Sequence, residues 1–156
     1  MKLLKILLEQ EKILKPARTK DRAERYLRAL QGKIQEYIKN GSKGSLNLQD
    51  TPITSLPDNL KYVGGNLLLS NTPIKSLPDN LEVKGSLELD DTPIISLPDN
   101  LKVGRTLILS RTLIRSLPSS LEVEGNLAIR DTPLDYNHDD VDIKEMAPNI
   151  KGKIYR

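Results

Sequence analysis

The sequence has no cysteine, tryptophan or phenylalanine, one histidine and five tyrosines among its 156 residues. Without cysteine the chain forms no disulfide, offers no thiolate nucleophile and has no cysteine-based zinc site. A histidine-based metal site would need several carboxylates as additional ligands. Because aromatic side chains are so few, aliphatic side chains must build the core.

Long apolar runs are also missing, so no transmembrane span is expected. The start, which reads MKLLKILLEQEKILK, resembles a signal peptide only superficially, because Lys5 interrupts the apolar stretch and no small-residue cleavage site follows. Residues 1–44 contain 12 Lys/Arg and 5 Asp/Glu, whereas residues 45–156 contain 12 and 16. We therefore expect a cytoplasmic protein without membrane contact, in which a basic segment precedes a mildly acidic body.

A repeat of 20 residues runs from Ser45 to about Thr132. Its units read SLNLQDTPITSLPDNLKYVGG, NLLLSNTPIKSLPDNLEVKG, SLELDDTPIISLPDNLKVGR, TLILSRTLIRSLPSSLEVEG and a truncated NLAIRDTPL. The first unit has one extra residue, most simply Tyr62. Self-similarity at this period predicts a solenoid, in which each unit stacks only on its neighbours.

Each unit combines a strand period with two corners. Leu87 and Leu89 alternate with polar residues, Thr92-Pro93 indicates a bend, and Pro98-Asp99-Asn100 indicates a corner. No stretch of a unit is long enough for an ordinary helix. Since a single coil cannot cover its own aliphatic side chains, the coils must stack in register, about 4.8 Å apart.

The frame L-x-L-x-x-[N/T]-x-[L/I]-x-x-L-P occurs as LELDDTPIISLP and LLLSNTPIKSLP. The sequence therefore resembles the leucine-rich repeat family, in its short bacterial and phage-type form, over residues 45–132. Similar repeats occur in secreted bacterial effectors, whose catalytic cysteine this chain lacks. The family's usual ladder asparagine is replaced by threonine, and we expect these hydroxyls to hydrogen-bond along the stack. The threonines are Thr51, Thr72, Thr92, Thr112 and Thr132.

A stacked array leaves two open apolar ends, which need caps. In TKDRAERYLRALQGKIQEYIKNG, apolar residues recur at helical spacing, with Thr19 as the expected N-cap and Gly41 as the C-terminal stop. A shorter helix over KLLKILLEQEKIL would end before Pro16, so residues 1–44 are predicted to form a helical hairpin. At the other end, residues 150–154 match residues 83–87 and predict a last edge strand.

The predicted fold is an α+β solenoid. It consists of five stacked 20-residue leucine-rich-repeat-like β coils with an N-terminal α-helical hairpin cap, and a parallel β-helix is the alternative. The predicted domains are an N-terminal helical cap (1–44), the solenoid (45–132) and a C-terminal cap (133–156).

The sequence contains no constellation typical of catalysis. Nucleotide-binding and zinc-protease motifs are absent, and the serines at 55, 76, 96 and 116 occupy one repeated structural position. In DYNHDDVDIKEM, Asp135, Asn137 and Asp139 fit the first ligand positions of a calcium loop. However, Asp140 stands where the loop needs glycine, and Glu145 is one residue short of the bidentate position. We therefore expect no enzyme, no metal and no cofactor.

Outward positions vary between coils while core positions hardly change, which indicates a binding surface. The resemblance to leucine-rich repeats implies that a protein partner binds the face of the strands, and a mixed apolar and polar face suits such a partner. The candidate protein-binding residues are Leu68, Ser70, Glu88, Asp90, Ile108, Arg111, Leu113, Arg115, Ala128 and Arg130.

The fourth coil breaks the pattern, and two interpretations of its arginines stay open. Arg111 and Arg115 would form a basic hot spot for binding. Alternatively they neutralise charge along the stack, since Arg111 would lie between Asp91 and Asp131 and Arg115 next to Asp135. A second column would alternate in the same way, formed by Lys61, Glu82, Lys102 and Glu122. The replacement of proline by Leu113 has no structural explanation at this level.

These observations predict a non-enzymatic protein–protein interaction module, an adaptor or inhibitor encoded by a bacterium or phage and located in the cytoplasm of the bacterium or infected host cell. One alternative is a nucleic-acid-associated protein that uses the basic residues 1–44. Another is a structural or self-assembling subunit. The sequence leaves open the identity of the partner and whether the chain is a monomer or a dimer.

Overall fold

The computed structural model describes the backbone of residues 2–156 and the side chains of residues 20–156. The chain divides into two compact units, Met1–Glu36 and Tyr37–Arg156. In the described part of the chain, no helix is both long and apolar enough to cross a membrane.

The N-terminal segment forms one helix, α1 (Lys2–Lys39), and not the predicted helical hairpin. The helix runs through Pro16 and Thr19, where the sequence predicted a break. That prediction was wrong because the segment has no glycine before Gly32 and is rich in Leu, Lys, Glu and Arg, which have high helix propensity. A proline removes one backbone hydrogen bond, whereas a hairpin turn would interrupt several. The capping role assigned to this segment stays a prediction.

The predicted stop of this helix at Gly41 is confirmed. Gly41 has a φ of 82°, a left-handed conformation that glycine adopts without the steric cost of a Cβ. Its N–H donates to the carbonyl of Ile38, and the N–H of Ser42 donates to the carbonyl of Tyr37. These two bonds satisfy carbonyls of the last helical turn.

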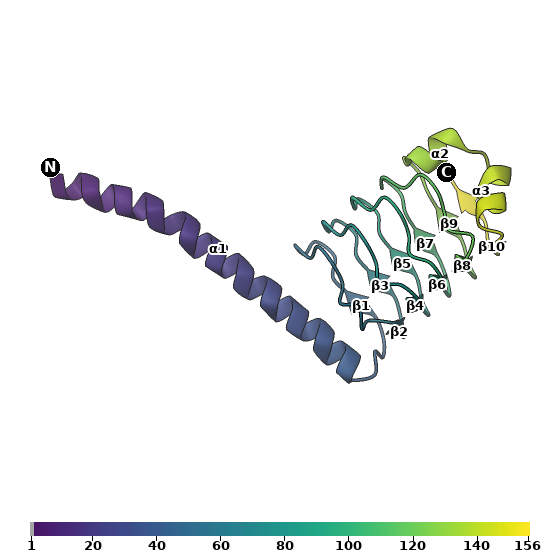
Figure 1. The fold of residues 1–156 in the computed structure, drawn as a ribbon, viewed down its shortest axis with the longest axis horizontal. Coiled ribbons are helices and arrows are strands. Elements are labelled where there is room, and N and C mark those ends of the chain that lie inside the picture. Colours follow the sequence, from purple (N-terminus) through teal and green to yellow (C-terminus); the bar gives the residue numbers. More distant parts are fainter. Residues whose placement is uncertain (1) are drawn as a thin grey trace. The chain divides into compact units, whose positions relative to one another are not determined.

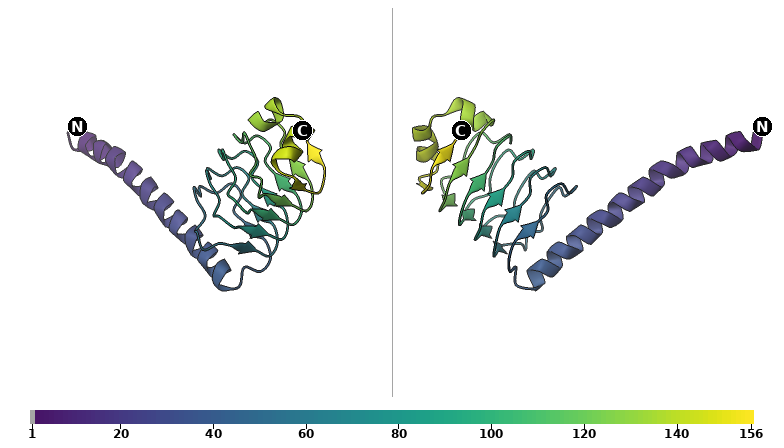
Figure 2. Two further views of the ribbon diagram at one scale, coloured as in Figure 1. Left: turned by 45° about the vertical axis from the view of Figure 1, so that its right-hand side comes forward. Right: turned by 180° about the vertical axis from the view of Figure 1, so that it is seen from behind.

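The second unit is a solenoid of parallel strands, as the repeat predicted (Figures 1 and 2). One sheet has six strands, in the order β1 (Leu46–Asn47), β3 (Leu67–Leu68), β5 (Leu87–Glu88), β7 (Leu107–Ile108), β9 (Leu127–Ala128) and β11 (Ile154–Tyr155). The other has five, namely β2 (Tyr62–Val63), β4 (Glu82–Val83), β6 (Lys102–Val103), β8 (Glu122–Val123) and β10 (Asn149–Ile150). Each full turn adds one strand to each sheet. The predicted five coils match this array only approximately, because the solenoid has about four full turns.

The core is a stack of aliphatic side chains from the inward positions of both sheets. In each strand pair the inward residue lies beside the inward residue at the equivalent position of the next coil, for example Leu67 beside Leu87 and Val83 beside Val103. An isoleucine from the long connection of each coil completes the stack. The fully buried set includes Leu67, Leu69, Ile74, Leu81, Leu87, Leu89, Ile94, Leu101, Leu107 and Leu109.

The threonine column bonds within each coil and not along the stack, which corrects the prediction. The hydroxyl of Thr92 donates to the carbonyl of Leu89, three residues back, at 2.6 Å. The same bond recurs at Thr51, Thr72, Thr112 and Thr132. A buried hydroxyl must find an acceptor, and after the turn that ends each strand of the six-stranded sheet the nearest one is the carbonyl of its own coil. Thr132 also accepts a hydrogen bond, from the N–H of Asp135.

A second side-chain ladder joins the coils at the corner between the two sheets. Asn66 Oδ1 accepts the backbone N–H of Ser86 at 2.9 Å, and Ser86 Oγ accepts that of Thr106 at 3.4 Å. At the end of the stack, Asn126 Oδ1 accepts the N–H of Lys153 at 2.9 Å. Side-chain oxygens thus satisfy backbone donors where the strands bend, which explains the Ser, Thr and Asn at this position.

The extra residue of the first coil is Lys61, and not Tyr62 as predicted. Tyr62 pairs with Glu82 in the sheet, so the column of outward residues reads Tyr62, Glu82, Lys102, Glu122 and Asn149. Lys61 is displaced because Leu60 and Val63 must both stay in the core, and its Nζ donates to the carbonyl of Asp79. The predicted charge alternation is therefore limited to Glu82, Lys102 and Glu122, where Lys102 and Glu122 form an ion pair at 3.0 Å.

The C-terminal segment was predicted to form one last edge strand, and it forms two short ones, β10 at the end of the five-stranded sheet and β11 at the end of the six-stranded sheet. Ile150 pairs with Val123, and Ile154 pairs with Leu127. Between the repeats and these strands lie two short helices, α2 (Pro133–Asn137) and α3 (Asp140–Met146), which bury Leu134 and Ile143. These helices begin at Thr132 and Asp139, which act as N-caps.

Candidate partner-binding surface

The strand face is the outward side of the six-stranded sheet, formed by alternate residues of its strands. Its central column runs in register from Asn47 through Leu68, Glu88, Ile108 and Ala128 to Tyr155. Leu68, Ile108 and Ala128 are half-buried, whereas Tyr155 is 48% exposed. The column is an apolar stripe that a single carboxylate, that of Glu88, interrupts.

The acidic group of the strand face lies in a partly desolvated setting. Glu88 Oε2 accepts from Gln49 Nε2 at 3.5 Å, and Ser70 Oγ donates to Asp90 Oδ1 at 2.5 Å. Partial burial, and secondarily the negative charge of Asp90, raise the pKa of Glu88 above its usual range. Within the described residues, no Lys or Arg side chain forms an ion pair with Glu88. A cation brought by a partner would therefore relieve an existing electrostatic cost.

Arg111 lies at the edge of the strand face and binds two aspartates of the preceding coil, Asp90 and Asp91. Its Nε lies 2.9 Å from both carboxylate oxygens of Asp91, and its Nη2 lies 2.8 Å from Asp91 Oδ2 and 3.2 Å from Asp90 Oδ2. This hydrogen bonding lowers the pKa of Asp91 and outweighs the opposing effect of desolvation. The geometry is that of charge neutralisation between adjacent coils. Asp131, the other expected neighbour, instead accepts from the Tyr136 hydroxyl at 3.1 Å.

The backbone at Arg111 explains why Asp and Asn fill this column elsewhere. Arg111 has a φ of 57°, and the equivalent residues Asp50, Asn71, Asp91 and Asp131 have φ between 55° and 58°. Asp and Asn tolerate this left-handed conformation better than other non-glycine residues. Arginine gains no such local benefit, so its contacts with Asp90 and Asp91 offset the unfavourable backbone.

Leu113 and Arg115 lie beyond this left-handed turn, in the connection that follows the strand. Leu113 is 53% exposed, and its N–H donates to the carbonyl of Ile94 at 3.1 Å. A proline at this position has no N–H and could not form this bond, which accounts for the loss of proline in the fourth coil, whereas nothing in the structure explains the choice of leucine. Arg115 is exposed and, within the described residues, forms no ion pair. Its expected neighbour Asp135 pairs with Arg156, at 2.8 Å from Nε to Oδ1.

The structure brings together most of the predicted binding residues. Leu68, Glu88, Ile108 and Ala128 lie on adjacent strands, and the turn at Arg111 separates them from Leu113 and Arg115. Asp90 and Arg130 follow in the next column, where the Arg130 Nε donates to the carbonyl of Arg156 at 3.4 Å. Ser70 belongs to this column but is only 3% exposed, so its prediction as an outward binding residue was wrong; its hydroxyl is held against Asp90 of the next coil.

The sequence reasoning did not assign the exposed residues Tyr155 and Ile95 to any surface. Tyr155 extends the central column beyond Ala128. The match between Ile154 and Leu87 was a signal that could have placed Tyr155 there, because the residue after Leu87 is Glu88 of the central column. Ile95 is 63% exposed and lies in the connection of the third coil, where the equivalent residues Thr54, Lys75 and Arg115 are polar, a contrast that could have identified it.

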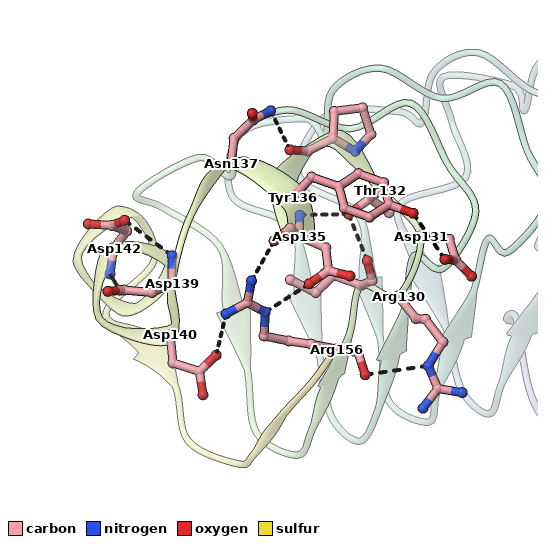
Figure 3. A network of polar contacts seen from close by, with 12 residues as sticks. Arg130, Asp131, Thr132, Asp135, Tyr136, Asn137, Asp139, Asp140, Asp142 and Arg156 are labelled. Atoms are coloured by element: carbon pink, nitrogen blue, oxygen red, sulfur yellow. Dashed lines mark hydrogen bonds and ion pairs between the residues drawn. The ribbon is translucent and has the colours of Figure 1, made fainter.

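The acidic segment near the C-terminus is occupied by internal contacts (Figure 3). Asp135 binds Arg156, and Asp139 Oδ1 accepts the N–H groups of Val141 and Asp142 as the N-cap of α3. Among the described residues, no cluster of three or more His, Asp or Glu side chains could hold a metal ion. His138 Nδ1 lies 3.8 Å from Asp142 Oδ2 within the same segment.

Comparison with known proteins finds no family model and no curated protein that matches this chain. The arguments about function therefore rest on the repeat and on the geometry of its surface.

Proposed function

We propose that this chain is a non-enzymatic protein-interaction module of the leucine-rich repeat type, which binds a protein partner through the strand face. The observation that carries the proposal is the central column, in which half-buried Leu68, Ile108 and Ala128 flank or follow the partly desolvated Glu88. Protein interfaces combine an apolar centre with a few placed polar groups, and this column has that composition.

The chemistry of the face specifies the partner further. Glu88 has no cationic neighbour in ion-pair contact among the described residues, whereas Asp90 and Asp91 both contact Arg111. A partner with apolar side chains around one Lys or Arg would cover the apolar residues of the central column and pair with Glu88. Burial of that ion pair would favour specificity and the rate of association more than affinity.

The setting of the function follows from the resemblance in the sequence. Short repeats of this type suit a small adaptor or inhibitor encoded by a bacterium or a phage. We place its action in the cytoplasm of the bacterium or of the infected host cell.

The proposal is tested by isolating a partner and varying the face. The full chain, immobilised, is used to capture proteins from bacterial extract, and a captured protein is then purified for affinity measurement. Replacing Leu68 and Ile108 together by Ser should weaken binding at least tenfold, and Glu88→Lys should weaken it as much through charge reversal. Ile95→Ser, an exposed aliphatic residue outside the face, is the matched control and should leave affinity unchanged.

The stability of each variant is measured in parallel, because Leu68 and Ile108 are half-buried. Unchanged affinity in a folded Leu68→Ser, Ile108→Ser double variant would exclude the strand face as the binding site.

A further inference from the structure

The two edge strands of the six-stranded sheet differ in the hydrogen bonding of their outward backbone groups. At the first end, Asn47 Oδ1 accepts the N–H of Gln49 at 3.0 Å. In the neighbouring sheet, the N–H of Gly64 donates to the carbonyl of Ser42 at 2.8 Å. The N–H of Gln49, which points away from the sheet, is therefore already bonded to a side chain.

The other end is open. β11 is the last strand of its sheet, and the carbonyls of Lys153 and Tyr155 accept hydrogen bonds from Leu127 and Ile129 of the preceding coil. Backbone direction alternates along a strand, so the N–H and C=O of Ile154 point away from the sheet. Neither group forms a hydrogen bond with any of the described residues. An unpaired edge of this kind is a template for another strand.

A cleft of about 770 Å³ lies beside this edge, between α3 and the segment that leads into β11. Its apolar lining includes Pro148, Ile154 and Val141, of which Val141 is 64% exposed. Val141, Pro148 and Ile154 together give an apolar lining beside the unpaired strand, which a second chain could cover.

The charges around the cleft are of both signs. Lys144 and Lys153 line it together with Asp140 and Glu145. Asp140 lies 3.7 Å from Arg156, while Lys144, Glu145 and Lys153 form no ion pair within the described residues. A two-fold interface must be self-complementary, and a surface with lysines and carboxylates supplies both members of such pairs.

We propose that this C-terminal edge is a homodimer interface, in which β11 pairs antiparallel with β11 of a second copy around Ile154. An edge lysine normally discourages strand addition, and a second copy supplies the acidic groups that offset Lys153. Antiparallel pairing about a two-fold axis perpendicular to the sheet joins the two six-stranded sheets into one. Both strand faces then lie on the same side, so a dimer presents two copies of the face together.

The test is the mass of the full-length protein in solution, measured by sedimentation equilibrium over concentrations from about 1 to 500 μM, the range in which interfaces of modest size associate. Wild type should be a monomer–dimer equilibrium without higher species. Val141→Asp places a charge in the cleft, and Ile154→Pro removes the outward N–H, which an edge strand tolerates. Each should weaken dimerisation at least tenfold. Ile95→Asp, a substitution of an equally exposed aliphatic residue away from the cleft, should leave the dimer unchanged.

Far-UV circular dichroism identifies any variant that fails to fold, and Val141→Asp still decides the question if Ile154→Pro does. A wild-type monomer at every concentration would overturn the proposal. So would open-ended association, or a dimer that Val141→Asp leaves intact.

Discussion

Replacing Gly85 by alanine tests the close stacking of the coils. A Cβ at Gly85 would lie 2.7 Å from the carbonyl carbon of Gly65 and 2.8 Å from the backbone nitrogen of Asn66. Both are backbone atoms of the preceding coil, so neither can rotate away, and ordinary contacts begin near 3.4 Å. The coils must therefore separate locally.

The expected cost combines three terms. Overpacking of an interior costs about 1–3 kcal/mol. Separation also lengthens the bonds from Gly85 N–H to Gly65 O and from Ser86 N–H to Asn66 Oδ1, both 2.9 Å, and loss of one such bond costs about 0.5–1.5 kcal/mol. Alanine restricts the unfolded chain, which returns about 0.4–1 kcal/mol. We expect a net loss of roughly 2–3 kcal/mol in the free energy of unfolding.

The assay is urea denaturation followed by circular dichroism. The matched control is Arg105→Ala, because Arg105 occupies the same position in the next coil and already carries a Cβ, and its N–H donates to the carbonyl of Gly85 at 3.1 Å. This control should change stability by less than about 0.5 kcal/mol, as surface substitutions usually do. If Gly85→Ala is as stable as wild type, the coils are not in the contact described, and the argument from close stacking fails.

Three further predictions concern single side chains. The pKa of Glu88 is raised in the folded state, so its negative charge destabilises the fold above that pKa and has no effect below the unfolded pKa. Glu88→Gln should therefore stabilise the protein at pH 7 and lose this advantage below about pH 4. An equal effect at both pH values would contradict the desolvation of Glu88. Arg111→Asp should destabilise the protein, most strongly at low salt, because it removes the ion pair with Asp91 and stacks three carboxylates. Arg111→Asn should lower stability less, because asparagine tolerates the φ of 57°. Effects that do not depend on salt would show that the ion pair contributes nothing. Leu113→Pro should not stabilise the protein, because loss of the hydrogen bond to Ile94, about 0.5–1.5 kcal/mol, offsets the entropic gain of about 0.4–1 kcal/mol. If Leu113→Pro melts at a higher temperature than Leu113→Ala, the hydrogen bond to Ile94 does not contribute to stability.

The regular part of the fold was predictable because the repeat states the same constraint several times. Leucines two residues apart, recurring every 20 residues, allow parallel strands in register and place Leu87 beside Leu107. The same reasoning placed Ile150 and Ile154 correctly across a long insertion. The N-terminal segment carries no repeat, and there Pro16 was taken as a break that the surrounding helix formers override.

The candidate site was predictable as a face but not as a set of contacts. Alternation along the strands identified Leu68 and Ile108 as outward, and the structure adds that they are half-buried and that Tyr155 continues their column. The extra residue of the first coil could not be assigned from spacing alone, since moving the insertion from Tyr62 to Lys61 leaves every leucine in place. Only the pairing of Tyr62 with Glu82 decides it.

The sequence by itself determined that this chain stacks, because a 20-residue coil with one inward stripe buries its aliphatic side chains only against another copy of the coil. The tertiary structure decided where each polar group finds its partner. Thr92 bonds back to Leu89, Arg111 binds Asp91 and Asp90, and the N–H of Leu113 reaches Ile94. These choices depend on a left-handed turn and on the distance to the neighbouring coil, and neither quantity is encoded in the spacing of residues along the chain.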